Sequence, residues 1–395
     1  MKRILLISVV YPPEPVVSAK VSWDIAHQLA TIQGNNVSVL SPRPSRPLGY
    51  DFKNIVDVND NVKHIVLDSF VHPKSSFIGR LRESYSFGIK AAEYIRKHKN
   101  NIDCIYLVSW PFYATHKLIG EAHKCGIPIV VSITDIYPES MTSRLGIIGK
   151  IIEPFLKRID AKWLHQTNKI FSISEYTQKY LETSRNLKDK VEVVRIWQED
   201  SVFNNVKQAE RVSNNEFVFM FCGSLSPAAK VPFVIKAFKK IKNTDIKLRI
   251  VGDGSERNEC FELAADDARI SFDSVTPNQV PLFQAQADVL LLPLAPGVGK
   301  TASPSKLVAY LMSAKPVIAS IDVDSDAAQI INKANCGLVS PSFDDESLIN
   351  NMITMYGKRC DELTSLGKNG QEYAKKHLSK EVNLHKACEI IMSVI

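Results

Sequence analysis

Long apolar runs and paired cysteines are both missing from this sequence. No apolar stretch in its 395 residues approaches the roughly 18 residues that a transmembrane helix needs. The cysteines are odd in number, scattered and without a CxxC pair, which argues against a structural zinc site and against a disulfide framework. We therefore expect a cytoplasmic protein with reduced thiols, at Cys104, Cys125, Cys222, Cys260, Cys336, Cys360 and Cys388.

The start of the chain has only part of the pattern of a secretory signal. Basic residues precede the apolar run Ile4–Val10, but the run is short. Tyr11-Pro12-Pro13 ends it without a small-residue cleavage site. We interpret Ile4–Val10 as a first β-strand.

Acidic metal-binding motifs are also absent, and the aromatic residues are not interleaved with the basic ones. This pattern argues against a bound metal and against a nucleic-acid partner. The formal net charge of +7 nevertheless favours an anionic partner, and nucleotide phosphates and lipid headgroups both qualify.

Short apolar runs alternate with helical patterns, which predicts α/β domains with parallel sheets and helices on both faces. The chain is long enough for two such domains. We expect Rossmann-like domains at 1–203 and 217–375, facing across a cleft, with the polar linker 204–216 between them. A C-terminal helical tail, 376–395, is expected to pack back on the first domain. Ligands of such sheets bind at the carboxyl ends of the strands.

A helix is predicted to begin at Ser303-Pro304, after an apolar strand and a flexible loop at Pro296–Gly299. Serine caps free backbone N–H groups, and proline suits the first helical position. Lys306 then lies in the first turn, where the helix dipole disfavours a cation unless an anion is bound as well. We predict a phosphate site at Ser303, Pro304, Ser305 and Lys306, and an ordinary capped helix is the alternative.

Several short motifs occur in an order and spacing that resembles the family-4 glycosyltransferases, which have the GT-B fold. The likeness extends over essentially the whole chain and is greatest to the bacterial branch that transfers amino- or deoxy-sugars in O-antigen and capsule synthesis. It implies a nucleotide-diphospho-sugar donor, for which we expect UDP, and no metal. The motifs are Ile4–Pro13, Asp135–Ser140, Phe171–Glu175, Phe221–Ser224, Val251–Gly254, Pro304–Lys306 and Pro316–Ile318.

The resemblance assigns the donor diphosphate to the turn after the strand Phe217–Cys222. Gly223 and Ser224 form this turn, and glycine lets a backbone approach a ligand closely. Lys230 matches a basic residue that assists in the family. A tight strand–helix connection with a solvated lysine is the alternative.

Two further turns are assigned to the nucleotide base by the same resemblance. Gly252-Asp253-Gly254 corresponds to the family's turn beside the base, and a bare turn is the alternative. Val275 corresponds to the strand end that contacts the base through its backbone.

Two family features are missing. The wider family has two glutamates eight residues apart, the first on the sugar and the second on the ribose. Thr301 and Ala309 occupy these positions here, so the usual ribose contact is in doubt. The glycine pair after the opening strand is replaced by Pro15–Ser18.

On the acceptor side, Asp135 follows a buried strand where many relatives have a His-Asp pair. We predict that Asp135 orients the acceptor, with Lys230 and Lys306 as the other catalytic residues. For Asp135 and Glu139, capping of the helix near Pro138 is the alternative. The histidines of the helical segments, His116, His123 and His165, are interpreted as surface or boundary residues.

The helical segments 147–164 and 80–99 are basic and amphipathic. Such helices can rest on an anionic bilayer, and a lipid-linked acceptor would require this. A helix that covers the sheet with a solvated basic face is the alternative.

These features favour a retaining glycosyltransferase of cell-surface polysaccharide synthesis. It would transfer an N-acetylated amino- or deoxy-hexose to a lipid-linked or glycan acceptor at the cytoplasmic membrane face. A non-catalytic scaffold of a glycan-assembly complex and a GT-B sugar-nucleotide epimerase or hydrolase remain as alternatives.

Overall fold

The computed structural model describes residues 1–32, 34–46, 52, 62–73, 76–110, 112–197, 200–203, 216–276, 279–301 and 305–395. The chain divides into two compact units. Unit 1 consists of Met1–Ile196 and Asn383–Ile395, and unit 2 of Trp197–Val382.

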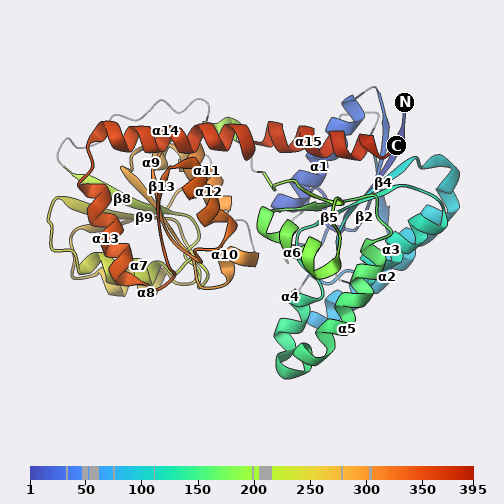
Figure 1. Ribbon diagram of the computed structural model, residues 1–395, viewed down its shortest axis with the longest axis horizontal. Coiled ribbons are helices and arrows are strands. Elements are labelled where there is room, and N and C mark those ends of the chain that lie inside the picture. The colour runs from blue at the N-terminus through green and yellow to red at the C-terminus, as the bar shows by residue number, and fades with distance from the viewer. Residues whose placement is uncertain are drawn as a thin grey trace. The chain divides into compact units, whose positions relative to one another are not determined.

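Unit 1 is built on a seven-stranded parallel sheet with the strand order β3-β2-β1-β4-β5-β6-β7 (Figure 1). The central strands are apolar on both faces because helices cover both. The strands are β1 (Arg3–Ile7), β2 (Asn36–Pro42), β3 (Val62–Leu67), β4 (Cys104–Val108), β5 (Ile129–Ile133), β6 (Lys169–Ser172) and β7 (Val191–Val193).

Helices α2, α3 and α6 contribute to the core on one face of this sheet, and α1 packs on the other face with residues of α15 (Figure 1). The helices of unit 1 are α1 (Val17–Thr31), α2 (Phe77–His98), α3 (Tyr113–Lys124), α4 (Glu139–Thr142), α5 (Gly146–Leu164) and α6 (Glu175–Arg185). Short 3-10 turns lie at Lys99–Asn101, Ser143–Leu145 and, in unit 2, Ser201–Phe203.

Unit 2 has a six-stranded parallel sheet with the order β10-β9-β8-β11-β12-β13. Its strands are β8 (Phe217–Cys222), β9 (Ile246–Val251), β10 (Ile270–Asp273), β11 (Val289–Pro293), β12 (Val317–Ser320) and β13 (Gly337–Ser340). Its helices are α7 (Val231–Lys239), α8 (Arg257–Ala264), α9 (Val280–Ala285), α10 (Val298–Thr301), α11 (Ser305–Met312), α12 (Asp326–Ala334), α13 (Asp345–Tyr356) and α14 (Cys360–His377); α15 (Lys380–Ser393) begins here and continues in unit 1.

The predicted fold class is confirmed, with two parallel α/β sheets and a helical C-terminal region. Two local predictions need correction. The segment at Pro296–Gly299, predicted as a flexible loop, instead leads into the short helix α10. Helix α6 was not predicted because its sequence is polar, although Ser174 caps it through a 3.1 Å bond from the Thr177 amide.

Candidate functional site

The predicted donor residues of unit 2 gather at the carboxyl edge of its sheet. Strand β8 lies between β9 and β11, so the connections after β8 and β11 leave the sheet in opposite directions. This divergence is where open α/β sheets bind ligands. The turn after β8 carries Gly223 and Ser224, and the turn after β9 carries Gly252, Asp253 and Gly254.

These two turns are in backbone contact, and only glycine fits between them. Gly223 and Gly252 have φ values of +150° and +140°, which side-chain-bearing residues rarely adopt. A Cβ on Gly252 would lie 2.0 Å from the carbonyl oxygen of Gly223, and one on Gly254 would lie 2.1 Å from that of Leu225. The amide of Gly223 donates to the carbonyl of Val251 over 2.9 Å.

Lys306 lies against this turn from the first turn of α11, as predicted. A Cβ on Gly223 would lie 2.3 Å from its Cε. The Nζ donates to the Ser224 carbonyl over 3.3 Å and lies 4.6 Å from the centroid of the Phe221 ring. No carboxylate in the described part of the chain pairs with it. Burial lowers the pKa of Lys306 to about 8, and a bound anion would raise this pKa again by favouring the charged form.

Tyr310 holds the end of β8 in place. Its buried hydroxyl donates to the carbonyl of Cys222 and accepts from the Cys222 amide, both over 2.9 Å. This bond pair joins α11 to the residue before Gly223. We had not singled out Tyr310 from the sequence, and only its position four residues after Lys306, on the same helix face, would have indicated it.

Arg257 is a second cation at this edge that we had not singled out from the sequence. It donates to Ser274 Oγ over 2.7 Å and lies 3.4 Å from a carboxylate oxygen of Asp253, whose side chain is mostly exposed. Val275, from the same loop as Ser274, is half-buried against the core. The turns after β9 and β10 are thereby joined, and the base contact assigned to Val275 stays a prediction.

The other residues predicted to bind the donor diphosphate are Lys230, Ser303, Pro304 and Ser305. Lys230 is the N-cap residue of α7, in the left-handed conformation, and its ammonium lies 5.8 Å from the centroid of the Phe343 ring. Ser303 and Pro304 lie outside the described residues. Ser305 is the first residue of α11, and the missing family glutamate would lie on the same helix, at the half-buried Ala309.

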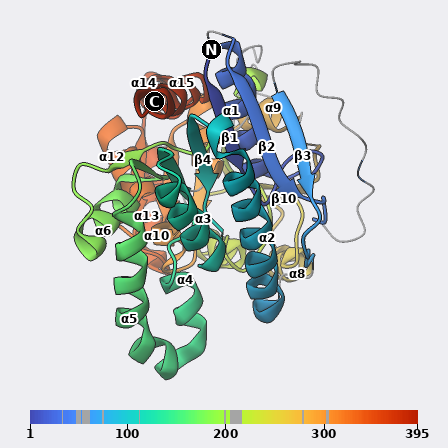
Figure 2. The ribbon, with the colours of Figure 1, turned by 90° about the vertical axis from the view of Figure 1, so that its right-hand side faces the viewer.

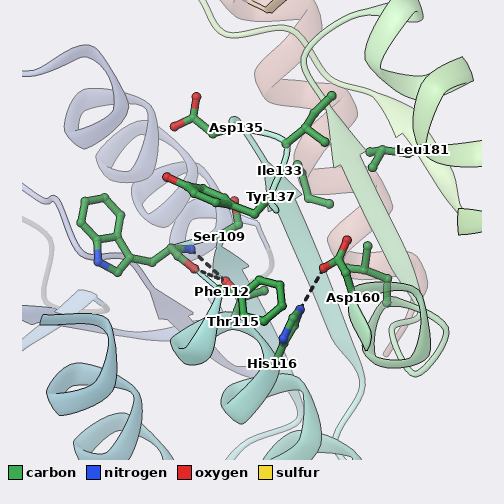
Figure 3. Close-up of a pocket in the computed structure, with 12 residues that line it drawn as sticks. Ser109, Phe112, Thr115, His116, Ile133, Asp135, Tyr137, Asp160 and Leu181 are labelled. Atoms are coloured by element: carbon green, nitrogen blue, oxygen red, sulfur yellow. Dashed lines mark hydrogen bonds and ion pairs between the residues drawn. The ribbon is translucent and has the colours of Figure 1, made fainter. Parts of the chain in front are cut away.

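In unit 1, Asp135 lies two residues after β5 and lines a pocket with Ser109, Trp110 and Tyr137. Its carboxylate is exposed and points away from the His116–Asp160 pair, which lies at another wall of the same pocket (Figure 3). An exposed carboxylate at a strand end is free to contact an acceptor, and that role stays a prediction.

The interpretation of His116 as a surface or boundary residue is wrong. His116 is buried, and its Nε2 lies 2.8 Å from Oδ1 of Asp160 (Figure 3). Arg185, with a fully buried side chain, bonds to Asp160 over 3.0 Å and to both carboxylate oxygens of Glu139 over 2.7 Å. The sequence pattern does not indicate these pairings, because the partners lie on four separate helices, α3, α4, α5 and α6. His123 and His165 are exposed, as expected.

Glu139 therefore joins a buried charge network instead of capping a helix with its side chain. Burial alone would raise the pKa of Glu139, but hydrogen bonds from Arg185 and Tyr180 outweigh it and lower the pKa below its usual value. Lys157 also pairs with this network, through Glu139 and Glu153. These residues stabilise the packing of α4, α5 and α6.

Within the described ranges, no group of three or more His, Cys, Asp or Glu side chains is placed to hold a metal ion. The same ranges contain no helix with the length and apolar character needed to cross a membrane. The seven cysteines are free thiols, and five of them are buried.

Two family models match the chain, one in each unit. Residues 18–195 match the model described as Glycosyltransferase Family 4. Residues 216–358 match the model described as Glycosyl transferases group 1. No curated protein matches the chain.

Solved structures with the same fold cover the whole chain. A glycosyltransferase from Rickettsia africae has 16% identity and a TM-score of 0.66, over 100% of this chain and 98% of that one. HepE from Anabaena in complex with UDP has 14% identity and a TM-score of 0.68, over all of both chains. The lipopolysaccharide outer core galactosyltransferase WaaB, in its apo form, has 15% identity and a TM-score of 0.67, also over all of both chains.

Proposed function

We propose that this chain, a glycosyltransferase of the GT-B type with a family 4 domain followed by a group 1 domain, acts in cell-surface polysaccharide synthesis. It transfers an N-acetylated amino- or deoxy-hexose from a UDP-linked donor to a lipid-linked or glycan acceptor. The HepE structures with UDP and with UDP-glucose support a UDP-linked donor.

The observation that carries this proposal is the position of Lys306. Its ammonium is partly desolvated, lies against a glycine turn and donates a hydrogen bond to a backbone carbonyl. A cation held at the start of a helix without a carboxylate partner is suited to an oxyanion. The donor diphosphate supplies that oxyanion.

The same arrangement explains how the reaction is accelerated. Negative charge develops on the diphosphate as the sugar–phosphate bond breaks, and a cation already in place stabilises it without reorganisation. Lys306, Lys230 and the backbone at Gly223 and Ser305 provide this stabilisation, and no metal is needed. In a retaining front-face displacement the leaving phosphate takes the acceptor proton, so Asp135 orients the acceptor and need not act as a base.

Helix α5 supports contact with an anionic membrane. Both ribbon views show its first turns extending beyond the rest of unit 1 (Figures 1 and 2). The exposed apolar stripe, defined as Ile147, Ile148, Ile151 and Phe155, is 65–78% exposed. Lys150 and Arg158 are exposed beside the stripe. Apolar side chains flanked by cations are the pattern of a helix that lies in a bilayer interface.

Thermal unfolding with UDP, GDP, dTDP and ADP at millimolar concentration tests the donor. A ligand at about 100 times its Kd stabilises the folded protein by about 2.7 kcal/mol, which raises Tm by a few degrees. We expect the shift with UDP, and a loss of it in Lys306→Met. No shift with any of the four nucleotides would overturn the transferase function.

A non-catalytic scaffold is the second candidate, favoured by Ala309 at the position of the ribose-binding glutamate. The two candidates differ in turnover. Radiolabelled UDP-sugar is incubated with bacterial membrane lipid extract, and transfer to the lipid fraction supports the enzyme. UDP binding without transfer from any UDP-hexose tried would support the scaffold.

A further inference from the structure

The carboxyl edge of the sheet in unit 1 contains a cluster of buried polar side chains that the proposed reaction does not use. Glu14 follows β1, Arg46 follows β2 and Trp110 follows β4, while Arg80 comes from the first turn of α2. In the strand order, β1 lies between β2 and β4, so this cluster lies where the connections diverge. It occupies in unit 1 the position that the glycine turns occupy in unit 2.

The two arginines gather around one indole. The guanidinium carbons of Arg46 and Arg80 lie 5.1 Å and 5.8 Å from the centroid of the Trp110 ring. Arg46 bonds through Nη2 to Glu83, whose side chain is fully buried. Arg46 thus has a carboxylate hydrogen-bond partner, whereas Arg80 has none within the described ranges.

Several side-chain N–H groups of this cluster are buried without a partner. Of the five buried side-chain nitrogens without a hydrogen bond in the described part of the chain, four lie here: Nε and Nη1 of Arg46, Nε of Arg80 and Nε1 of Trp110. The Oγ atoms of Ser45 and Ser109 are buried without a partner too. Buried donors left without acceptors are costly, and native proteins contain few of them. Their concentration at one strand edge points to a missing ligand.

Among the unpartnered buried atoms of this cluster, hydrogen-bond donors outnumber hydrogen-bond acceptors. Glu14 is 4% exposed, and its Oε1 accepts the amides of Ser45 and Arg46 over 2.7 Å and 2.9 Å. Its Oε2 is buried without a partner. Burial raises the pKa of Glu14. A neutral sugar hydroxyl brings a donor with each acceptor, whereas this cluster needs acceptors on several sides.

We propose that Arg46, Arg80 and Trp110 bind a phosphate group of the acceptor. Guanidinium N–H groups recognise phosphate oxygens in pairs, and the indole N–H adds a donor from a third side chain. Calling the ligand the acceptor rests on the proposed transferase function, whereas the phosphate site itself does not. The phosphate belongs to a lipid headgroup or to a sugar phosphate, and both present the same oxygens.

Calorimetric titration of the full chain with glucose 1-phosphate tests the site, with UDP present in excess to fill the donor site and again without UDP. We expect binding that Arg80→Gln and Trp110→Phe each weaken about tenfold, since hydrogen bonds to charged groups are among the stronger ones. Trp110→Phe keeps the ring and removes only the N–H donor. Arg82→Gln is the matched control, because Arg82 is exposed on the same helix and stacks on Phe70. Its affinity should equal that of the wild type.

Comparing the affinity for a second ligand with that for glucose 1-phosphate shows whether the phosphate belongs to a lipid headgroup or to a sugar phosphate. Monomeric dihexanoyl phosphatidic acid that binds more tightly than glucose 1-phosphate, and loses affinity in Arg80→Gln, assigns the site to a lipid headgroup. The reverse order assigns it to a sugar phosphate. Binding that Arg80→Gln and Trp110→Phe leave unchanged, no binding of either phosphate, or a preference for glucuronate would overturn the proposal.

Titration with UDP tests the transferase function separately from the phosphate site of unit 1. Lys306→Met should lose UDP affinity and keep that for glucose 1-phosphate, and Arg80→Gln should do the opposite. A protein that binds phosphate through Arg80 but binds no nucleotide would retain the phosphate site and lose the proposed transferase function.

Discussion

Units 1 and 2 have the same strand order through their first six strands but carry different kinds of residue at the carboxyl edge. In unit 2 the turns after β8 and β9 contain glycines, and these glycines bring the two backbones into contact. Lys306 packs against the turn after β8. In unit 1 the corresponding edge holds large side chains, with Arg46, Glu83 and Trp110 in contact.

The difference matches two kinds of recognition. A diphosphate is common to many donors, and backbone N–H groups and one cation suffice to hold it. An acceptor differs from enzyme to enzyme, and side chains drawn from several loops can be exchanged one at a time. The proposed donor site of unit 2 therefore uses general phosphate recognition, and the proposed acceptor site of unit 1 uses side chains from separate loops.

The largest expected effect is on the side-chain network of unit 1. Arg185→Met removes the cation that Asp160 and Glu139 share, which costs about 3–5 kcal/mol of unfolding free energy. Urea denaturation measures it. Arg43→Met is the control, because its ion pair with Asp68 is exposed and should cost less than about 1 kcal/mol. Equal losses in both variants would contradict the structural role of Arg185.

Gly252→Ala tests the backbone contact in unit 2. The new Cβ meets the Gly223 carbonyl at 2.0 Å, so the turns must separate, at a cost of about 2–4 kcal/mol with loss of UDP binding. Gly126→Ala also changes a glycine of positive φ, at +66°, but with open space around it, and should cost about 1 kcal/mol. An alanine at 252 that still binds UDP normally would show that the close contact is not needed.

Lys306→Met separates binding from stability. We expect UDP affinity to fall about 10–100-fold, while the ligand-free protein becomes more stable at pH 7, because a partly desolvated charge is removed. Calorimetry and urea denaturation measure the two effects. A variant that loses both affinity and stability would make Lys306 a structural residue.

The same lysine predicts a pH dependence. Above its pKa of about 8 the amine of the free protein loses its proton, so UDP affinity falls by about tenfold per pH unit. The phosphates of UDP are already ionised there, since their second pKa is about 6. Titrations from pH 7 to 9.5 should show this decline in the wild type. In Lys306→Met the affinity should be flat over the same range.

The smallest effect concerns the exposed apolar stripe of α5. Replacing Ile147 and Ile151 by serine should weaken binding to vesicles that contain phosphatidylglycerol by about tenfold, because less apolar area enters the interface. Vesicle flotation measures it, and UDP affinity should stay unchanged. Replacing Leu282 and Val323, which are exposed on unit 2, is the control and should leave flotation unchanged.

The sequence predicted unit 2 better than unit 1 for a physical reason. Gly223, Gly252 and Lys306 belong to contiguous motifs whose conformation follows from local chemistry, and the structure brings them together. The cluster at Arg46 and Trp110 draws single residues from separate loops. The spacing of these residues along the chain does not indicate that they come into contact, so only the folded structure reveals the cluster.

The buried network shows the same limit. Periodicity placed His116 on a helix correctly, but it could not tell which side of that helix meets Asp160. Charged residues are expected at surfaces, and a buried Arg185 departs from that expectation only because two carboxylates accompany it.

The path of the chain through the two units has a consequence for synthesis on the ribosome. Unit 1 includes Asn383–Ile395, and Asn383 accepts a hydrogen bond from the amide of Arg195 over 3.0 Å. Ala387, Cys388 and Ile391 of this segment are fully buried. The segment leaves the ribosome after the whole of unit 2, so the half whose strands emerge first is the last to complete its core. Until then the residues of unit 1 that pack against Ala387, Cys388 and Ile391 stay uncovered in the nascent chain.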